Sequence, residues 1–137
     1  MVKKIFIDAS AFIALNDKSD QYFQRASKYL HTELNNLSID FVTSNLVIAE
    51  SYTRLLYKTH YHAAFQFLDA MEIIDTEIIY SNAEIELSAK HYLTKYFNLK
   101  LSYTDAVSFA IMTKFNILSA FSFDKHFEIA GFQLIPN

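Results

Sequence analysis

The sequence predicts an α/β fold with three layers, in which a mostly parallel sheet is flanked by helices. Short apolar runs rich in β-forming residues alternate with longer stretches of helical apolar spacing. The short runs are nearly continuous in apolar residues, as expected for strands that are buried on both faces. The single Gly and the single Pro argue against an all-β sandwich, whose tight turns need these residues.

The expected strands and helices alternate along the whole chain. The strand runs are Lys4–Ile7, Phe41–Thr43, Ile73–Asp75 together with Ile78–Tyr80, Ile117–Phe123, and Phe132–Ile135. The helices are expected after Asp20, after Asn45, at about 61–71, after Ser81–Asn82, from about Tyr103 to Phe115 with Ser102 or Thr104 as cap, and after Asp124. Ligands of such sheets bind at the carboxyl ends of the strands, so the chemistry is expected there.

Length and composition indicate one domain over residues 1–137. Apolar residues make up 52% of the chain and aromatic residues 16%, which supports a real core and excludes a disordered chain. We expect most of the Phe and Tyr side chains to pack in that core. The absence of Cys excludes a disulfide framework, a Cys-ligated zinc site and a thiol nucleophile.

The charge balance restricts the way in which the chain could bind nucleic acid. The net charge is −3, so a broad basic surface is not expected and contacts with nucleic acid must be local. No apolar run approaches the ~18–20 residues of a membrane span. The run Ile5–Ile7 is stopped by Asp8 and is too short for a signal peptide. We therefore expect a cytoplasmic protein without a membrane partner.

Two aspartates stand at the ends of predicted strands. Asp8 follows the run Ile5–Ile7, and Asp124 follows the run Ile117–Phe123. Both carboxylates should therefore lie at the carboxyl edge of the sheet. The simpler interpretation is that each of them caps the next helix, which stabilises a helix by about 0.5–2 kcal/mol.

Two further acids lie beside apolar helix faces. Glu50 has Leu46 and Val47 as helical neighbours, although it could simply pair with Arg54 one turn later. Asp105 could form a variant capping box with Ser102. Each of these simpler interpretations explains one residue only.

A shared crevice explains all four acids at once. Clustered carboxylates repel one another and raise one another's pKa. Such a cluster persists when it binds a hard divalent cation such as Mg²⁺, which prefers oxygen ligands. Ions of this kind can activate water for an in-line attack on a phosphodiester. The four acids are Asp8, Glu50, Asp105 and Asp124.

The segments around these acids resemble the acidic motifs of PIN-domain ribonucleases, in particular the small single-domain proteins of the VapC toxin type. Order and spacing match across nearly the whole chain. The segments are Phe6-Ile7-Asp8-Ala9-Ser10, residues 44–50 (Ser-Asn-Leu-Val-Ile-Ala-Glu), Ser102-Tyr103-Thr104-Asp105-Ala106 and residues 121–127 (Phe-Ser-Phe-Asp-Lys-His-Phe). The resemblance implies a parallel five-stranded sheet, Mg²⁺- or Mn²⁺-dependent endonuclease activity on RNA, a homodimer and an antitoxin partner.

The resemblance also implies roles for individual residues. Asp8 and Asp105 would be direct metal ligands. Glu50 and Asp124 would bind through water, hold a second ion or orient the attacking water. The hydroxyl groups of Ser10 and Ser122 would support a ligand carboxylate or a metal-bound water, unless they only bond to the backbone.

Contacts with RNA and with a second protein are expected at two places. Arg54, Lys58 and Lys125 are candidate phosphate contacts, unless they are ordinary solvated charges or a dimer groove takes that role. The stretch Tyr52–Phe67 carries more apolar surface than a small domain needs in one place. We expect it to form part of a dimer or partner surface.

The sequence leaves two alternatives to a nuclease and disfavours a zinc site. A phosphoryl-transfer protein with a strand-end aspartate is one alternative, but Asp8-Ala9-Ser10 lacks the second acid of a D-x-D motif. A non-catalytic PIN-like interaction module is another, although all four acids are present. A zinc site at His60 and His62 is disfavoured because residues i and i+2 do not face each other on a helix. The other histidines are expected at the surface or half-buried.

Overall fold

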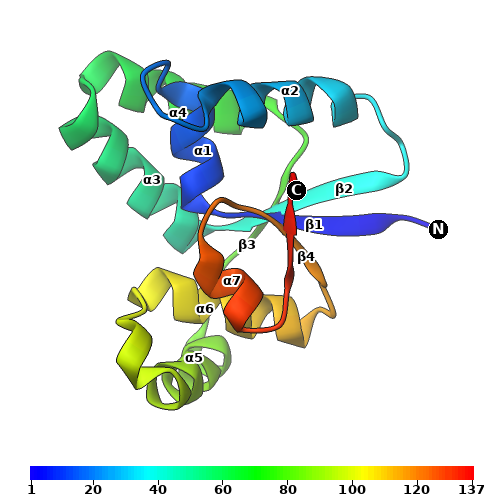
Figure 1. Cartoon of the computed structure of the whole chain (residues 1–137), viewed down its shortest axis with the longest axis vertical. Helices are drawn as coiled ribbons and strands as arrows, with labels where there is room; N and C mark the ends of the chain where they lie inside the picture. Colours follow the sequence, from blue (N-terminus) through cyan, green and yellow to red (C-terminus); the bar gives the residue numbers. More distant parts are fainter.

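The computed structural model describes residues 1–137 and shows a parallel sheet between two layers of helices (Figure 1). Its five strands have the spatial order β3-β2-β1-β4-β5, and all neighbouring strands are parallel. The fold class predicted from the alternating runs is therefore confirmed. The strands are β1 (Lys3–Ile7), β2 (Ile39–Ser44), β3 (Glu77–Ile79), β4 (Ser119–Phe121) and β5 (Gln133–Ile135).

The helices divide between the two faces of the sheet. Helices α1 to α4 cover one face, and α5 to α7 lie on the other (Figure 1). No helix combines the length and the apolar character that a membrane crossing requires. The helices are α1 (Ala9–Asn16), α2 (Phe23–Glu33), α3 (Asn45–Lys58), α4 (Tyr61–Ile73), α5 (Ala83–Lys95), α6 (Tyr103–Lys114) and α7 (Lys125–Ile129), with a short 3₁₀ turn, η1 (Phe97–Leu99).

At the central strand β1, the order in which successive strands are added to the sheet reverses. The chain runs from β1 outward through β2 to β3, and then returns to add β4 and β5 on the other side of β1. Ile7 is paired with Phe121 at the carboxyl ends of β1 and β4. In open α/β sheets, the crevice at such a switch point is where ligands bind. Asp8 and Ser122 follow these two paired residues directly.

Large apolar side chains fill both sides of the sheet, as the composition predicted. Phe6, Phe109 and Phe121 are completely buried. Phe109 packs edge-on against Phe127, with ring centroids 4.9 Å apart, and Phe12 packs on Phe67 at 5.1 Å. Full burial of one such side chain contributes about 1.5–3 kcal/mol. This core holds the strand ends and helix starts that carry the acids.

Two predicted strands differ from the observed ones. Residues 73–75 were expected to be extended, but Ile73 ends α4 and the N–H of Ile74 donates to the carbonyl of Ala70. The adjacent β-branched residues favoured a strand, yet Ile73 is 83% exposed and has no strand beside it. The run 117–123 pairs as a strand only over Ser119–Phe121.

Two predicted helix caps have other roles. Ser44, not Asn45, caps α3, and its hydroxyl accepts from the N–H of Val47 at 3.1 Å. The Asn45 side chain instead accepts from the N–H of Ser81. Asp20 lies before the start of α2 and accepts from the N–H of Tyr22 at 2.8 Å. The predicted starts at Asn82, Ser102 and Asp124 are correct, and the apolar residues after Asp8 form the additional helix α1.

Candidate active site

Asp8 begins the site at the end of β1. Its backbone N–H still donates to the carbonyl of Phe121 on β4, at 3.1 Å, so the residue continues the sheet by one position. Its side chain caps α1. The capping interpretation from the sequence is therefore correct, but it accounts for only one of the two carboxylate oxygens.

The two oxygens of Asp8 have different surroundings. Oδ2 accepts from the hydroxyl of Ser10 at 2.8 Å, from the N–H of Ser10 at 3.3 Å and from the hydroxyl of Ser122 at 2.9 Å. Oδ1 is buried and has no hydrogen-bond partner. Burial raises the pKa of Asp8 and the negative charge of Asp124 adds to this, while the two serine hydroxyls act in the opposite direction. A buried, unpartnered carboxylate oxygen is costly unless it has a ligand.

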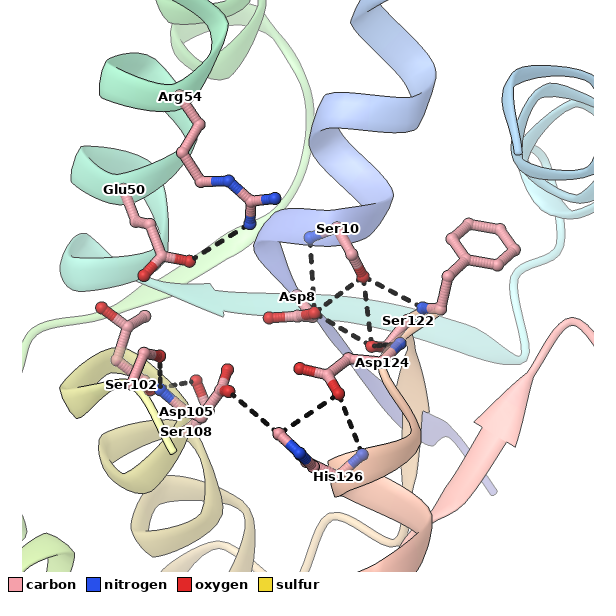
Figure 2. A network of polar contacts seen from close by, with 12 residues as sticks. Asp8, Ser10, Glu50, Arg54, Ser102, Asp105, Ser108, Ser122, Asp124 and His126 are labelled. Atoms are coloured by element: carbon pink, nitrogen blue, oxygen red, sulfur yellow. Dashed lines mark hydrogen bonds and ion pairs between the residues drawn. The ribbon is translucent and has the colours of Figure 1, made fainter. Parts of the chain in front are cut away.

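The two serines connect the first and the last acidic segments. The Ser10 hydroxyl accepts from the N–H of Phe123 at 3.0 Å, and the Ser122 hydroxyl accepts from the N–H of Asp124 at 3.0 Å. Since both hydroxyls also donate to Asp8, they fix the turn after β4 against the end of β1 (Figure 2). This places the start of α7 beside Asp8.

Asp105 enters the same space from α6. The Ser102 hydroxyl caps this helix by accepting from the N–H of Asp105 at 3.0 Å, while the Asp105 side chain points towards the other acids (Figure 2). Burial raises the pKa of Asp105 to about 8, and the negative charges of Asp8, Asp124 and Glu50 contribute in that order. The reciprocal capping box expected from the sequence is thus only half present. Its carboxylate half faces the site instead.

Glu50 approaches from the first half of α3. Burial raises its pKa, the charge of Asp8 adds to this, and the Arg54 guanidinium partly opposes it. The expected pair one helical turn apart exists, with Glu50 Oε2 and Arg54 Nη1 3.8 Å apart. Because Arg54 is about half exposed, this ion pair contributes little to stability.

Asp124 and His126 complete the site. Asp124 caps α7 by accepting from the N–H of His126 at 2.9 Å. The Nδ1 atom of His126 lies 3.4 Å from Asp124 Oδ1 and 3.9 Å from Asp105 Oδ2. Ligand atoms of these three residues all lie within 4.8 Å of one another. The three side chains therefore have the spacing of a possible cation site.

All of these side chains face one open cavity of about 560 Å³. The donor set is almost entirely oxygen, and one buried oxygen, Oδ1 of Asp8, has no partner within the protein. A hard divalent cation would satisfy that oxygen and relieve the repulsion that raises the pKa values. The residues present therefore fit a divalent metal ion. The acids that line the cavity are Asp8, Asp20, Glu50, Asp105 and Asp124.

A family model for the PIN domain matches residues 5–133, which span every element that builds this cavity. The chain belongs to the PIN domain family. A curated relative, VapC20 of Mycobacterium tuberculosis, is named a 23S rRNA-specific endonuclease. It is 29% identical over 128 residues, which cover 93% of this chain and 95% of that protein.

Two solved structures share the fold of this chain. The crystal structure of Mycobacterium tuberculosis VapC20, described as a toxin that cleaves the sarcin–ricin loop, aligns with a TM-score of 0.84 and 30% identity. The alignment covers 93% of this chain and 95% of that chain. VapBC2 from Rickettsia felis, bound to a DNA fragment from its promoter, aligns with a TM-score of 0.70, 14% identity and 96% coverage of both chains, and supports the PIN fold alone.

The structure places every candidate residue from the sequence at or beside this PIN site. The four acids and Ser10 line the cavity directly, and Ser122 lies behind Asp8. Arg54, Lys58 and Lys125 also line it. Lys58 is already engaged, since its Nζ lies 2.9 Å from Asp20 and 3.5 Å from Asp17. The predicted contacts of these cations with RNA remain predictions.

Sequence reasoning did not single out His126 and Lys100, which also line the PIN site. His126 was grouped with ordinary histidines, because a lone histidine near a helix start carries no spacing signal of its own. Its position two residues after a predicted strand-end acid was the available signal. Lys100 adds a further cation to the cavity wall. It lies in the left-handed region, with φ of 54°, in a turn that no sequence pattern identified.

Proposed function

We propose that this protein is an endoribonuclease that depends on Mg²⁺ or Mn²⁺ and hydrolyses RNA phosphodiester bonds. The observation that carries this proposal is the buried, unpartnered Oδ1 of Asp8 at the centre of a cluster of four carboxylates. Membership of the PIN family and the similarity to VapC20, a named rRNA endonuclease, support the same reaction.

Each acid of the site has a proposed role that follows from its position and burial. Asp8 and Asp105, the most buried of the four candidate acids, would hold the ion directly. A bound Mg²⁺ or Mn²⁺ would stabilise the negative charge that develops on the phosphate. Glu50 has a raised pKa and is suited to orient the attacking water and to accept its proton. Asp124 would act through water or hold a second ion.

Substrate binding would rest on the cations around the acidic centre. With a net charge of −3, the protein has no general attraction for RNA, so local contacts must position the backbone. Arg54 and Lys58 on α3, Lys100 at the end of η1 and Lys125 at the start of α7 all line the cavity. Phosphates on either side of the cleaved bond would contact these side chains.

Purified protein incubated with RNA and either metal tests the proposal. Because VapC20 is described as cleaving the sarcin–ricin loop, a hairpin with that sequence and an unrelated hairpin are the first substrates to compare. We expect endonucleolytic products that disappear with EDTA. No cleavage of any RNA together with no Mn²⁺ binding in calorimetry would overturn the proposal and favour a non-catalytic interaction module. Phosphoaspartate formation on Asp8 would instead favour the phosphoryl-transfer alternative.

We also propose that the protein is the toxin of a toxin–antitoxin pair. Its similarity to VapC20, described as a toxin, supports this role. Induced expression should arrest growth, and co-expression of the neighbouring reading frame should restore growth and yield a complex on purification. Normal growth on expression of an active nuclease would instead identify a processing enzyme.

A homodimer is proposed through the surface of α3 and α4. Leu55 and Phe67 from the predicted apolar stretch are buried in the core, so the expected surface is smaller than the sequence indicated. Tyr57 is 84% exposed, and Tyr61 and Phe65 are each about half exposed, which leaves an aromatic patch. Sedimentation at micromolar concentration tests this proposal, and a monomer would refute it. Tyr57→Ser should weaken a dimer formed through this patch.

A further inference from the structure

His126 is held in a fixed position beside two acids of the site. It is the second residue of α7, and its N–H donates to the Asp124 carboxylate that caps the helix. Its ring faces Asp124 and Asp105 (Figure 2). The imidazole therefore belongs to the acidic wall of the cavity, although the four acids alone already account for the proposed metal site.

The Nδ1 atom of His126 is buried and has no hydrogen-bond partner. The same is true of Oδ1 of Asp8, a residue that is only 3% exposed and lines the same cavity. Two unpartnered polar atoms in one cavity indicate a ligand that the protein itself does not provide. Asp105 and Asp124 contribute negative charge beside them, so the ligand should be a cation.

The spacing of the atoms fits ligands of one ion. In an octahedral site with bonds of about 2.1 Å, adjacent ligand atoms are about 3.0 Å apart and opposite ones about 4.2 Å. Nδ1 of His126 lies 3.4 Å from Asp124 Oδ1 and 3.9 Å from Asp105 Oδ2. Small side-chain rotations would bring the three atoms to a common ion.

We infer that Nδ1 of His126 is a ligand of the divalent ion, that Asp105 and Asp124 bind the same ion, and that this nitrogen makes the site favour Mn²⁺ over Mg²⁺. In this arrangement Asp124 binds the ion directly, which replaces the water-mediated or second-ion role given to it above. The inference rests on the proposed function, because it concerns the same ion. Mg²⁺ is hard and strongly prefers oxygen, whereas first-row transition ions accept imidazole nitrogen. Replacing one oxygen ligand by nitrogen therefore weakens the site for Mg²⁺ relative to Mn²⁺.

Metal binding by the intact protein tests the inference without reference to activity. Calorimetry gives Kd for Mn²⁺ and Mg²⁺, and electron spin-echo envelope modulation of bound Mn²⁺ detects a directly coordinated ¹⁴N. We expect a nitrogen signal in the wild type. His126→Ala should lose the signal and raise Kd for Mn²⁺ at least about tenfold, with a smaller change for Mg²⁺.

Two further variants make the test specific. His126→Asn has an amide group close to the position of Nδ1. It should therefore retain ion binding through oxygen, while losing the nitrogen signal and the preference for Mn²⁺. His91 is an exposed histidine on α5 that does not line this cavity, so His91→Ala should leave the signal and both Kd values unchanged.

The outcomes separate this inference from the proposed function. A wild type that binds Mn²⁺ without a nitrogen signal, and with equal affinity before and after His126→Ala, overturns the histidine ligand and leaves the nuclease proposal standing. His126 would then form only an ion pair with the acids. A wild type that binds neither ion at millimolar concentration overturns both.

Discussion

Asp8 and Asp17 have the same local structure at the two ends of α1. Each is buried, and each accepts from the hydroxyl and the N–H of the serine two residues later. The hydroxyl distances are 2.8 Å from Ser10 to Asp8 and 2.6 Å from Ser19 to Asp17. Yet the pKa of Asp8 is raised and the pKa of Asp17 is lowered.

The difference comes first from burial, which raises the pKa of Asp8 most, whereas at Asp17 the hydrogen bonds from Ser19 outweigh it, and the neighbouring charges add to both shifts. The Ser19 hydrogen bonds lower the pKa of Asp17 most, and the ammonium group of Lys58, 3.5 Å away, acts in the same direction. Asp8 faces Asp124 and has no cation within the protein. At each residue one buried carboxylate oxygen has no hydrogen-bond partner, but Oδ2 of Asp17 has the ammonium group of Lys58 at 3.5 Å and Oδ1 of Asp8 has no cation beside it. Only Asp8 is therefore available for a metal ion.

The largest expected effect is on RNA cleavage. Asp8→Asn or Asp105→Asn should reduce the rate by about 10³-fold or more, because each removes a proposed metal ligand that supports several kcal/mol of transition-state stabilisation. Asp17→Asn is the matched control and should keep the rate within a few-fold of wild type after correction for folded protein. Single-turnover cleavage measures this. Equal losses in Asp8→Asn and Asp17→Asn would remove the distinction between the two aspartates.

Metal binding should stabilise the wild type and the Asp17 variant alike. At a concentration of Mn²⁺ 100 times Kd, linkage predicts about 2.7 kcal/mol of additional stability. Asp105→Asn should lose most of this gain, since it lacks a proposed ligand. Thermal unfolding with and without EDTA measures the shift. An Asp105→Asn protein stabilised as much as the wild type would contradict the assignment.

The stability of the metal-free protein should depend on pH in opposite directions at the two sites. The pKa of Asp105 is about 8 in the folded protein and about 4 in the unfolded chain, so the folded state binds more protons between these values and stability falls as pH rises across them. Asp105→Asn should remove this loss. At pH 8 without metal it should gain at least about 1.4 kcal/mol, the equivalent of one pKa unit.

Asp17 provides the opposite slope in the same measurements. Its lowered pKa contributes stability that is present at neutral pH and lost as pH falls below the ordinary range of an aspartate. Asp17→Asn should therefore flatten the acid side of the curve only. Urea unfolding at a series of pH values measures both effects. A curve of unchanged shape in Asp105→Asn would show that its carboxylate is already ionised at neutral pH.

A smaller effect is expected when the cation of the Asp17 site is removed. Lys58→Met should destabilise the protein by about 1 kcal/mol, because Lys58 is partly exposed while Asp17 remains buried without its cation. The pKa of Asp17 should rise towards that of Asp8. Carboxyl chemical shifts in an NMR titration measure this change. An unmoved Asp17 pKa would show that the Ser19 hydrogen bonds alone keep it low.

The sequence was sufficient for the acids but not for their surroundings. Asp8 and Asp124 were found because strand ends of a parallel sheet meet at one edge, and Glu50 because an acid beside an apolar helix face is unusual. Lys58 was predicted as a contact with RNA, yet its ion pairs with Asp17 and Asp20 depend on how the loop after α1 meets the end of α3. No local sequence pattern predicts this contact between the loop after α1 and the end of α3.

The same limit applies to His126 and to the Asp17 motif. The D-x-S pattern occurs at residues 8–10 and 17–19, and only the tertiary fold determines which copy faces other acids. The misassigned strand at Ile73–Asp75 has a related cause, because β-branched residues indicate strands only where a neighbouring strand is available.

The hydrogen bond between Ser122 and Asp8 joins residues that are 114 positions apart. A polypeptide that stops before β4 lacks Ser122, Asp124 and His126, so it cannot complete the acidic centre. If the protein is a nuclease as proposed, it becomes active only after its final segment has left the ribosome and folded. Translation products that terminate before β4 would therefore have no cleavage activity.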